Sequence, residues 1–146
     1  MSACVQALWM KRAMRGVIDS VEQVTMVTNG GIEGDANFGR SKRQVTIIDE
    51  AVFDTIRLQL PGVEAYMRRA NIMVRGIELR DTRDHLLSVG DVRIRICGET
   101  RPCERMDAQV SGLTAALDPD WRGGVFGVVL NDGIVSVGDE VSLESP

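Results

Sequence analysis

Aromatic residues, histidine and long hydrophobic runs are all scarce in this sequence. Aromatic side chains make up only 4% of it, so the stacking platforms that hold single-stranded nucleic acid are poorly supplied. The net charge of −4 also disfavours a nucleic-acid partner, because such partners select a basic surface. No hydrophobic run approaches the roughly 20 residues needed to cross a bilayer, and residues 1–15 hold too few apolar side chains for a signal peptide. We therefore expect a cytoplasmic protein with neither a nucleic-acid nor a membrane partner.

Cysteine is also rare, and its pattern excludes two structural uses. There are three cysteines, Cys4, Cys97 and Cys103, and an odd number does not build a disulfide framework. A zinc site is equally disfavoured, since the chain has no C-x-x-C pair and only one histidine, His85. Any functional cysteine is then expected to act as a thiol, or as a soft ligand to a metal other than zinc.

The size and composition of the chain are those of an ordinary globular domain. The chain has 146 residues, of which 44% are hydrophobic and 26% charged, so we expect one domain spanning residues 1–146 with one core. Short β-branched or alternating segments predict strands, at residues 21–27, 43–48, 92–96 and 124–130. Tight turns are predicted at Gly90-Asp91 and Gly138-Asp139, and a hairpin turn at Asn131-Asp132-Gly133.

Two segments have the pattern of helices. Asp49 is a good N-cap for a helix that runs to about Leu60, and Pro61-Gly62 ends it. A shorter helix is expected over residues 111–117. Together these signals predict a mainly β fold, a closed or partly open barrel of short strands with two or three helices.

The segment from Cys97 to Asp107 is the best candidate for a functional centre. It follows the strand predicted at residues 92–96, and Gly98 is expected to end that strand. Pro102 stiffens the loop, while Arg101 and Arg105 flank Cys103 and favour its reactive thiolate form. Glu104 opposes that effect, and a small buried thiol is the alternative. We predict that Cys103 is the catalytic residue.

Basic residues at loops and strand ends form a second candidate group. Arg43 precedes a predicted strand, Arg69 and Asn71 precede an apolar run, and Arg122 lies beside two glycines. Arginine suits planar anions such as phosphate because it forms bidentate hydrogen bonds, although a solvated rim is the alternative. Barrel closure gathers such positions at one mouth, so we predict that these four residues surround one electropositive pocket.

Several short motifs occur in an order that resembles the MOSC domain, the C-terminal domain of molybdenum cofactor sulfurase, in its small stand-alone form. The motifs are Gly31-Ile-Glu-Gly-Asp35, Arg43-Gln-Val-Thr46, Arg69-Ala-Asn71, Pro102-Cys103, Arg122-Gly-Gly124 and the Gly138-Asp139 turn. The resemblance covers the chain from Val5 to Leu143. It implies a β-rich barrel and a reactive cysteine that corresponds to Cys103.

The resemblance also implies specific chemistry. In relatives that bind the molybdenum–pterin cofactor (molybdopterin), the cysteine ligates molybdenum and basic side chains hold the pterin phosphate. The positions that correspond here are Cys103 for the metal and Arg43, Arg69, Asn71 and Arg122 for the cofactor, with Lys11 and Arg12 as weaker candidates. One position departs from the family's Gly-Asp-x-His pattern, because Asn37 stands where the histidine would be. An asparagine cannot exchange a proton near neutral pH.

Three hypotheses about function stay open. In the first, the protein binds molybdenum cofactor and supports a reduction, for instance of N-hydroxylated compounds, with electrons from a donor protein. In the second, Cys103 accepts sulfur as a persulfide from a cysteine desulfurase and passes it to a metal centre. The third is a barrel that only binds small anions or another protein.

Overall fold

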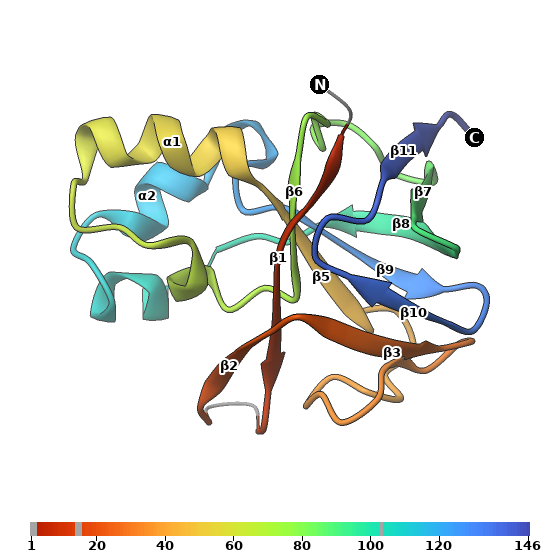
Figure 1. The fold of residues 1–146 in the computed structure, drawn as a ribbon. Helices are drawn as coiled ribbons and strands as arrows, with labels where there is room; N and C mark the ends of the chain where they lie inside the picture. The colour runs from red at the N-terminus through yellow and green to blue at the C-terminus, as the bar shows by residue number, and fades with distance from the viewer. Residues whose placement is uncertain (1–2, 14–15, 103) are drawn as a thin grey trace.

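The structure, a computed structural model, describes residues 3–13, 16–102 and 104–146 (Figure 1). Across these residues the chain is mainly β, with eleven strands and two α-helices. The strands are β1 (Cys4–Lys11), β2 (Ile18–Val21), β3 (Gln23–Val27), β4 (Gly31–Ile32), β5 (Val45–Asp49), β6 (Ile72–Arg75), β7 (Leu86–Val89), β8 (Val92–Glu99), β9 (Val125–Val129), β10 (Gly133–Ser136) and β11 (Val141–Glu144). The helices are α1 (Glu50–Gln59) and α2 (Leu113–Leu117), with short 3-10 turns η1 (Ala65–Arg68), η2 (Glu104–Ala108) and η3 (Pro119–Trp121).

The strands form one large sheet and one small sheet. The large sheet has the order β11-β7-β8-β9-β5-β6-β1-β2, and the small sheet has the order β10-β3-β4. The described residues form no ladder between the end strands β11 and β2, so the large sheet is an open one that curls. An isolated bridge between Cys4 and Glu140 ties β1 to the segment before β11. The fold is thus the partly open form of the predicted barrel.

The main core lies inside the curled sheet. In β8 the apolar residues Val92, Ile94 and Ile96 are buried, while Arg93 and Arg95 between them are exposed. The same alternation buries Val45 and Ile47 of β5 in this core. Period-two patterning therefore places one face of β8 and of β5 in this core, as the sequence predicts.

A second apolar cluster joins the helices to the outer face of the sheet. Phe53 and Ile56 of α1 and Leu113 of α2 pack with Ile48 of β5 and Trp9 of β1. Figure 1 shows both helices gathered on one side of the strands. Helix α1 connects β5 to β6, which run parallel, and a parallel pair needs such a crossover.

The longest helix was predicted correctly. It spans Glu50–Gln59, with Asp49 as N-cap and Leu60 as C-cap. The Asp49 side chain accepts a hydrogen bond from the Ala51 backbone amide at 3.0 Å. None of the helices among the described residues combines the length and apolar character of a membrane span.

Three details differ from the sequence predictions. Strand β8 does not end at Gly98 but continues to Glu99, because the chain bulges between Ile96 and Gly98 and keeps its pairing with β9. The segment 21–27 is not one strand, since β2 ends at Val21 and β3 begins at Gln23.

The hairpin predicted at Asn131-Asp132-Gly133 is also wrong. Strand β9 pairs with β5 and β8, whereas β10 pairs with β3 in the small sheet. Asn131 accepts a hydrogen bond from the Arg93 amide, and Asp132 accepts one from the Thr28 amide. These side chains tie the turn to β8 and to the residue that follows β3, and the chain changes sheets here.

Candidate functional site

The loop that leads to the predicted catalytic cysteine is held by a buried arginine. Cys103 itself lies outside the described residues. Arg68, only 7% exposed, donates from Nε to the Gly123 carbonyl at 3.1 Å and from Nη2 to the carbonyls of Thr100 at 3.0 Å and Arg101 at 3.4 Å. We call residues 100–103, between β8 and η2, the cysteine loop. The Arg68 side chain therefore joins the end of η1 to the start of this loop and to Gly123.

Gly123 explains why two glycines follow Arg122. A Cβ at residue 123 would lie 2.3 Å from the Thr100 carbonyl oxygen and 3.4 Å from Pro102 Cδ. At residue 124 the chain has a φ of +94°, and a Cβ there would lie 2.2 Å from the Ile47 carbonyl oxygen. Only glycine fits this close approach, which packs the cysteine loop against the edge of β9.

Four basic side chains gather near the same loop. Arg43 and Arg69 line a small hollow together with Thr46, Arg68, Ala70, Thr100 and Gly123. Lys11 feels the positive charges of Arg43, Arg69 and Arg40. We call Lys11, Arg40, Arg43 and Arg69 the basic cluster. Thr100 and Gly123 line the same hollow, and Gly123 lies against Pro102, the residue before Cys103 in the sequence.

Burial also affects the lysine in this cluster. Lys11 is 7% exposed, and burial lowers the pKa of its ammonium below the ordinary 10.5. The carboxylate of Asp35 opposes this shift of the pKa, whereas Arg43, Arg69 and Arg40 add to it. A bound anion would act on this pKa in the same direction as Asp35, by stabilising the charged ammonium.

Asn71 supports the residues around the basic cluster through hydrogen bonds. It is fully buried, and its Oδ1 accepts hydrogen bonds from the Thr46 amide and hydroxyl. Its Nδ2 donates to Asp35 Oδ1 at 3.0 Å and to the Trp9 carbonyl at 3.2 Å. Asn71 thus orients Thr46, which lines the hollow, and Asp35, which faces Lys11.

Two buried oxygens near the cluster have no hydrogen-bond partner among the described residues, namely Asn37 Oδ1 and Thr100 Oγ1. Asn37 is 1% exposed and follows Asp35, whose Oδ2 accepts the Asn37 backbone amide. Thr100 lines the hollow itself. Buried polar atoms are almost always paired in folded proteins, so both oxygens point to a missing partner such as a ligand or water.

Arg122 is placed elsewhere. It lines a larger cavity of about 460 Å³, with Asp49, Val52, Glu78, Arg80 and Trp121 among its other walls. Its Nη1 donates to the Ala116 carbonyl at 3.3 Å. Of the four predicted cofactor residues, the structure brings Arg43 and Arg69 together, sets Asn71 behind them, and places Arg122 in a separate cavity.

Arg12, a weaker candidate, points into solvent and forms an ion pair with Asp19 at 2.8 Å. Arg68 belongs to an arginine doublet, Arg68-Arg69, whose place before an apolar run suits a planar anion, but in the structure it holds the backbone instead. Its partners are backbone carbonyls that no side-chain pattern reveals. Among the described residues, no group of three or more histidine, cysteine, aspartate or glutamate side chains is arranged to hold a metal ion.

Asp49, in the larger cavity, gives a prediction about pH. Burial raises the pKa of its carboxyl above the usual 3.8, with further increases from the charges of Glu78, Glu50 and Asp54. A raised carboxyl pKa means that the ionised form costs stability once the pH exceeds the unfolded value. Asp49→Asn keeps an N-cap acceptor and should raise the Tm at pH 7 by at most about 3 °C, because the carboxyl is only half buried.

The gain in Tm should vanish as the pH falls below about 4, where the aspartate is protonated in both states. Thermal unfolding followed by circular dichroism between pH 3 and pH 8, roughly the span of the carboxyl titration, measures it. If the variant is less stable than the parent at pH 7, the stabilisation that the charged carboxylate gives as helix cap exceeds the cost of burying it.

Comparisons with known proteins agree with this architecture. A sequence model of the MOSC domain matches residues 34–142. The crystal structure of the YuaD protein from Bacillus subtilis superposes with a TM-score of 0.86 at 20% identity, covering 100% of this chain and 97% of that one. YiiM from Escherichia coli superposes with a TM-score of 0.74 at 16% identity, covering 100% of this chain and 71% of that one.

YiiM from Geobacillus stearothermophilus gives a TM-score of 0.76 at 14% identity, covering 97% of this chain and 74% of that one. A search of curated proteins finds no match. At these identities the solved structures establish the fold alone. The match of the domain model, which spans most of the residues from the glycine-rich loop to β11, establishes that the chain belongs to the MOSC domain family.

Proposed function

We propose that this chain binds molybdenum cofactor through its phosphate at the basic cluster, beside Cys103, and takes part in molybdenum and sulfur chemistry. The observation that carries the proposal is the convergence of Lys11, Arg43 and Arg69 next to the cysteine loop. The MOSC family is associated with this cofactor, and the donor set of these three side chains suits a phosphate.

The residues of the cluster fit the anionic part of the cofactor. Burial and neighbouring arginines lower the pKa of Lys11, while Asp35 opposes them, and a phosphate would further stabilise the charged ammonium. The Thr100 hydroxyl, without a partner among the described residues, could donate to the same anion. The hollow measures only about 10 Å³, which accommodates about one water-sized group. A phosphate would therefore place one oxygen in it and lie over its mouth.

The chain's own contribution is to bind the anion and present a thiolate. Arg69 donates a hydrogen bond to the Gly16 carbonyl at 2.8 Å, which restrains its guanidinium. Arg68 and Gly123 fix the loop that carries Cys103. Arg101 and Arg105, which flank Cys103 in the sequence, would favour its thiolate form in this proposal. The cofactor, when bound, would supply a metal centre able to exchange oxygen or sulfur.

A second candidate is a persulfide carrier, and the small volume of the hollow favours it. A persulfide on Cys103 is a compact anion that needs no room for a pterin. In this version a cysteine desulfurase supplies the sulfur, whereas in the cofactor version an electron-donor protein supplies electrons. Both versions need a reduced thiol, so we place the protein in the cytoplasm.

Molybdenum analysis distinguishes the two versions. Protein purified from a host that makes the cofactor should contain close to one molybdenum atom per chain by plasma mass spectrometry, together with the fluorescence of oxidised pterin. Arg69→Ala should lose most of the metal, since it removes a phosphate donor. Arg12→Ala is the matched control, because Arg12 is exposed and paired with Asp19, and it should retain the metal.

Metal-free protein that carries cyanide-releasable sulfur on Cys103 would reject the cofactor version and support the carrier. Protein with neither molybdenum nor releasable sulfur, after expression with cofactor and desulfurase present, would reject both.

A further inference from the structure

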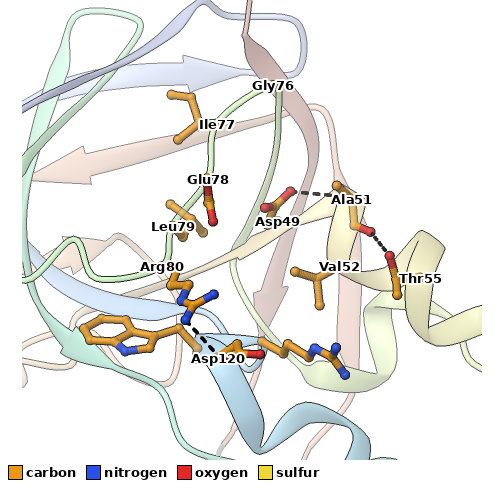
Figure 2. A pocket seen from close by; sticks show the side chains of 12 residues that line it. Asp49, Ala51, Val52, Thr55, Gly76, Ile77, Glu78, Leu79, Arg80 and Asp120 are labelled. Atoms are coloured by element: carbon orange, nitrogen blue, oxygen red, sulfur yellow. Dashed lines mark hydrogen bonds and ion pairs between the residues drawn. The ribbon is translucent and has the colours of Figure 1, made fainter.

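The larger cavity has the size and lining of a ligand site, and it is separate from the basic cluster. Its volume is about 460 Å³, within the range of small-molecule pockets. It lies between the start of α1, the segment Gly76–Arg80 after β6, and η3 (Figure 2). Among the described residues, none that lines this cavity also lines the small hollow.

One part of this cavity is negatively charged. Figure 2 shows the carboxylates of Asp49 and Glu78 near one another, and no described cation forms an ion pair with either. The charges of Glu78, Glu50 and Asp54 raise the pKa of Asp49. Glu50 is compensated by Arg75 at 3.6 Å. Two like charges beside a cavity favour a ligand that brings an ammonium group.

Another part of the cavity is positively charged. Arg80 pairs with Asp120 at 3.3 Å and with Asp81 at 3.6 Å, so its charge is already balanced. Arg122 forms no ion pair with any described carboxylate, and a backbone carbonyl, that of Ala116, accepts its Nη1. A guanidinium has five N–H donors. Arg122 therefore keeps donors for a carboxylate of a ligand.

Apolar side chains and a strained turn complete the walls. Val52, Ile77 and Trp121 line the cavity, and the Arg83 guanidinium lies 5.9 Å from the centre of the Trp121 ring. Asp120 and Trp121 both have left-handed backbone conformations, with φ of 56° and 61°. Consecutive non-glycine residues in this region are uncommon, and such strain gathers at ligand sites.

We propose that this cavity binds a small zwitterion of the α-amino-acid type with an aliphatic side chain. Its ammonium group lies between Asp49 and Glu78, its carboxylate meets Arg122, and its side chain packs against Val52 and Ile77. A purely cationic ligand would leave Arg122 unmatched, and a purely anionic one would face the two carboxylates. This site does not depend on the proposed cofactor function.

Three probes with the same aliphatic skeleton test the proposal in the full chain by amide NMR titration. They are leucine, 3-methylbutylammonium, which lacks the carboxylate, and 4-methylpentanoate, which lacks the ammonium group. Leucine should shift the amide resonances of Ala51, Thr55 and Glu78, with an affinity about tenfold above that of either partial probe.

Charge-removing variants assign the two ends. Glu78→Gln should weaken leucine binding about tenfold and leave 4-methylpentanoate binding unreduced, whereas Arg122→Gln should weaken leucine and spare 3-methylbutylammonium. Glu140→Gln, an exposed change outside the cavity, is the control and should bind like the parent. The proposal is overturned if a partial probe binds as tightly as leucine, if the shifts lie elsewhere, or if about 20 mM leucine causes none.

Discussion

Replacing Arg68 with methionine is expected to lower the free energy of unfolding by about 3 kcal/mol. The guanidinium donates to the backbone carbonyls of Gly123, Thr100 and Arg101 from a side chain that is 7% exposed. Methionine fills much of the same space but donates nothing, so buried carbonyls lose their partners. Urea unfolding of parent and variant measures the difference.

The same variant should change the chemistry of Cys103. With the loop released from Gly123, the rate of alkylation of Cys103 is expected to change at least several-fold, while Cys4 and Cys97, both partly buried, should react as before. Peptide mapping after timed alkylation compares the three thiols. Arg12→Met removes an exposed arginine paired with Asp19 and should cost less than about 0.5 kcal/mol. An Arg68→Met protein as stable as the parent would mean that water replaces the arginine.

Periodicity and capping predicted the parts of the fold that depend on local sequence. Helix α1 follows from Asp49 and the spacing of Phe53 and Ile56, and β8 follows from its alternating arginines. The predicted end of β8 was wrong because the strand continues through a bulge before Gly98. Pairing with β9, which lies more than 25 residues further along the chain, stabilises this bulge. The hairpin predicted at Asn131 was wrong for a similar reason. The Asn131 side chain accepts a hydrogen bond from the backbone amide of Arg93, which lies in a distant strand.

The sequence predicted which residue types form the candidate site, but not which way their side chains point. Arginine beside a strand end indicated an anion site, and Arg43 and Arg69 do meet at one hollow. The sequence did not separate Asn71, which braces Thr46 and Asp35, from residues that face a ligand. Nor did it show that the consecutive residues Arg122 and Gly123 line different cavities. Such differences depend on side-chain direction, which tertiary packing fixes.

Lys11 is the residue at which stability and binding should oppose each other. Its side chain is buried, and burial lowers the pKa of the ammonium, a shift to which Arg43, Arg69 and Arg40 also contribute. A basic group with a lowered folded pKa costs stability while it is charged, and the cost disappears once the pH rises above its unfolded value of 10.5. Lys11→Met should therefore stabilise the protein at pH 7 by about 1 kcal/mol.

That gain requires Asp35 to remain satisfied without the ammonium. Asp35 still accepts hydrogen bonds from the backbone amides of Lys11 and Asn37 and from Asn71 Nδ2, and the first of these survives the substitution because it is a main-chain donor. The difference in stability between variant and parent should shrink as the pH approaches 10.5. Urea unfolding at pH 7 and at higher pH measures both values.

The same substitution should weaken anion binding, because it removes a buried cation from the basic cluster. With inorganic phosphate as the probe, calorimetry should show an affinity lower than that of the parent by about tenfold. Lys42→Met, at an exposed lysine, is the matched control and should change neither stability nor affinity by a comparable amount. A Lys11→Met protein that is more stable and still binds phosphate like the parent would move the anion site away from Lys11. If Lys11→Met is less stable than the parent, the attraction between the Asp35 carboxylate and the ammonium more than offsets the cost of burying that charge.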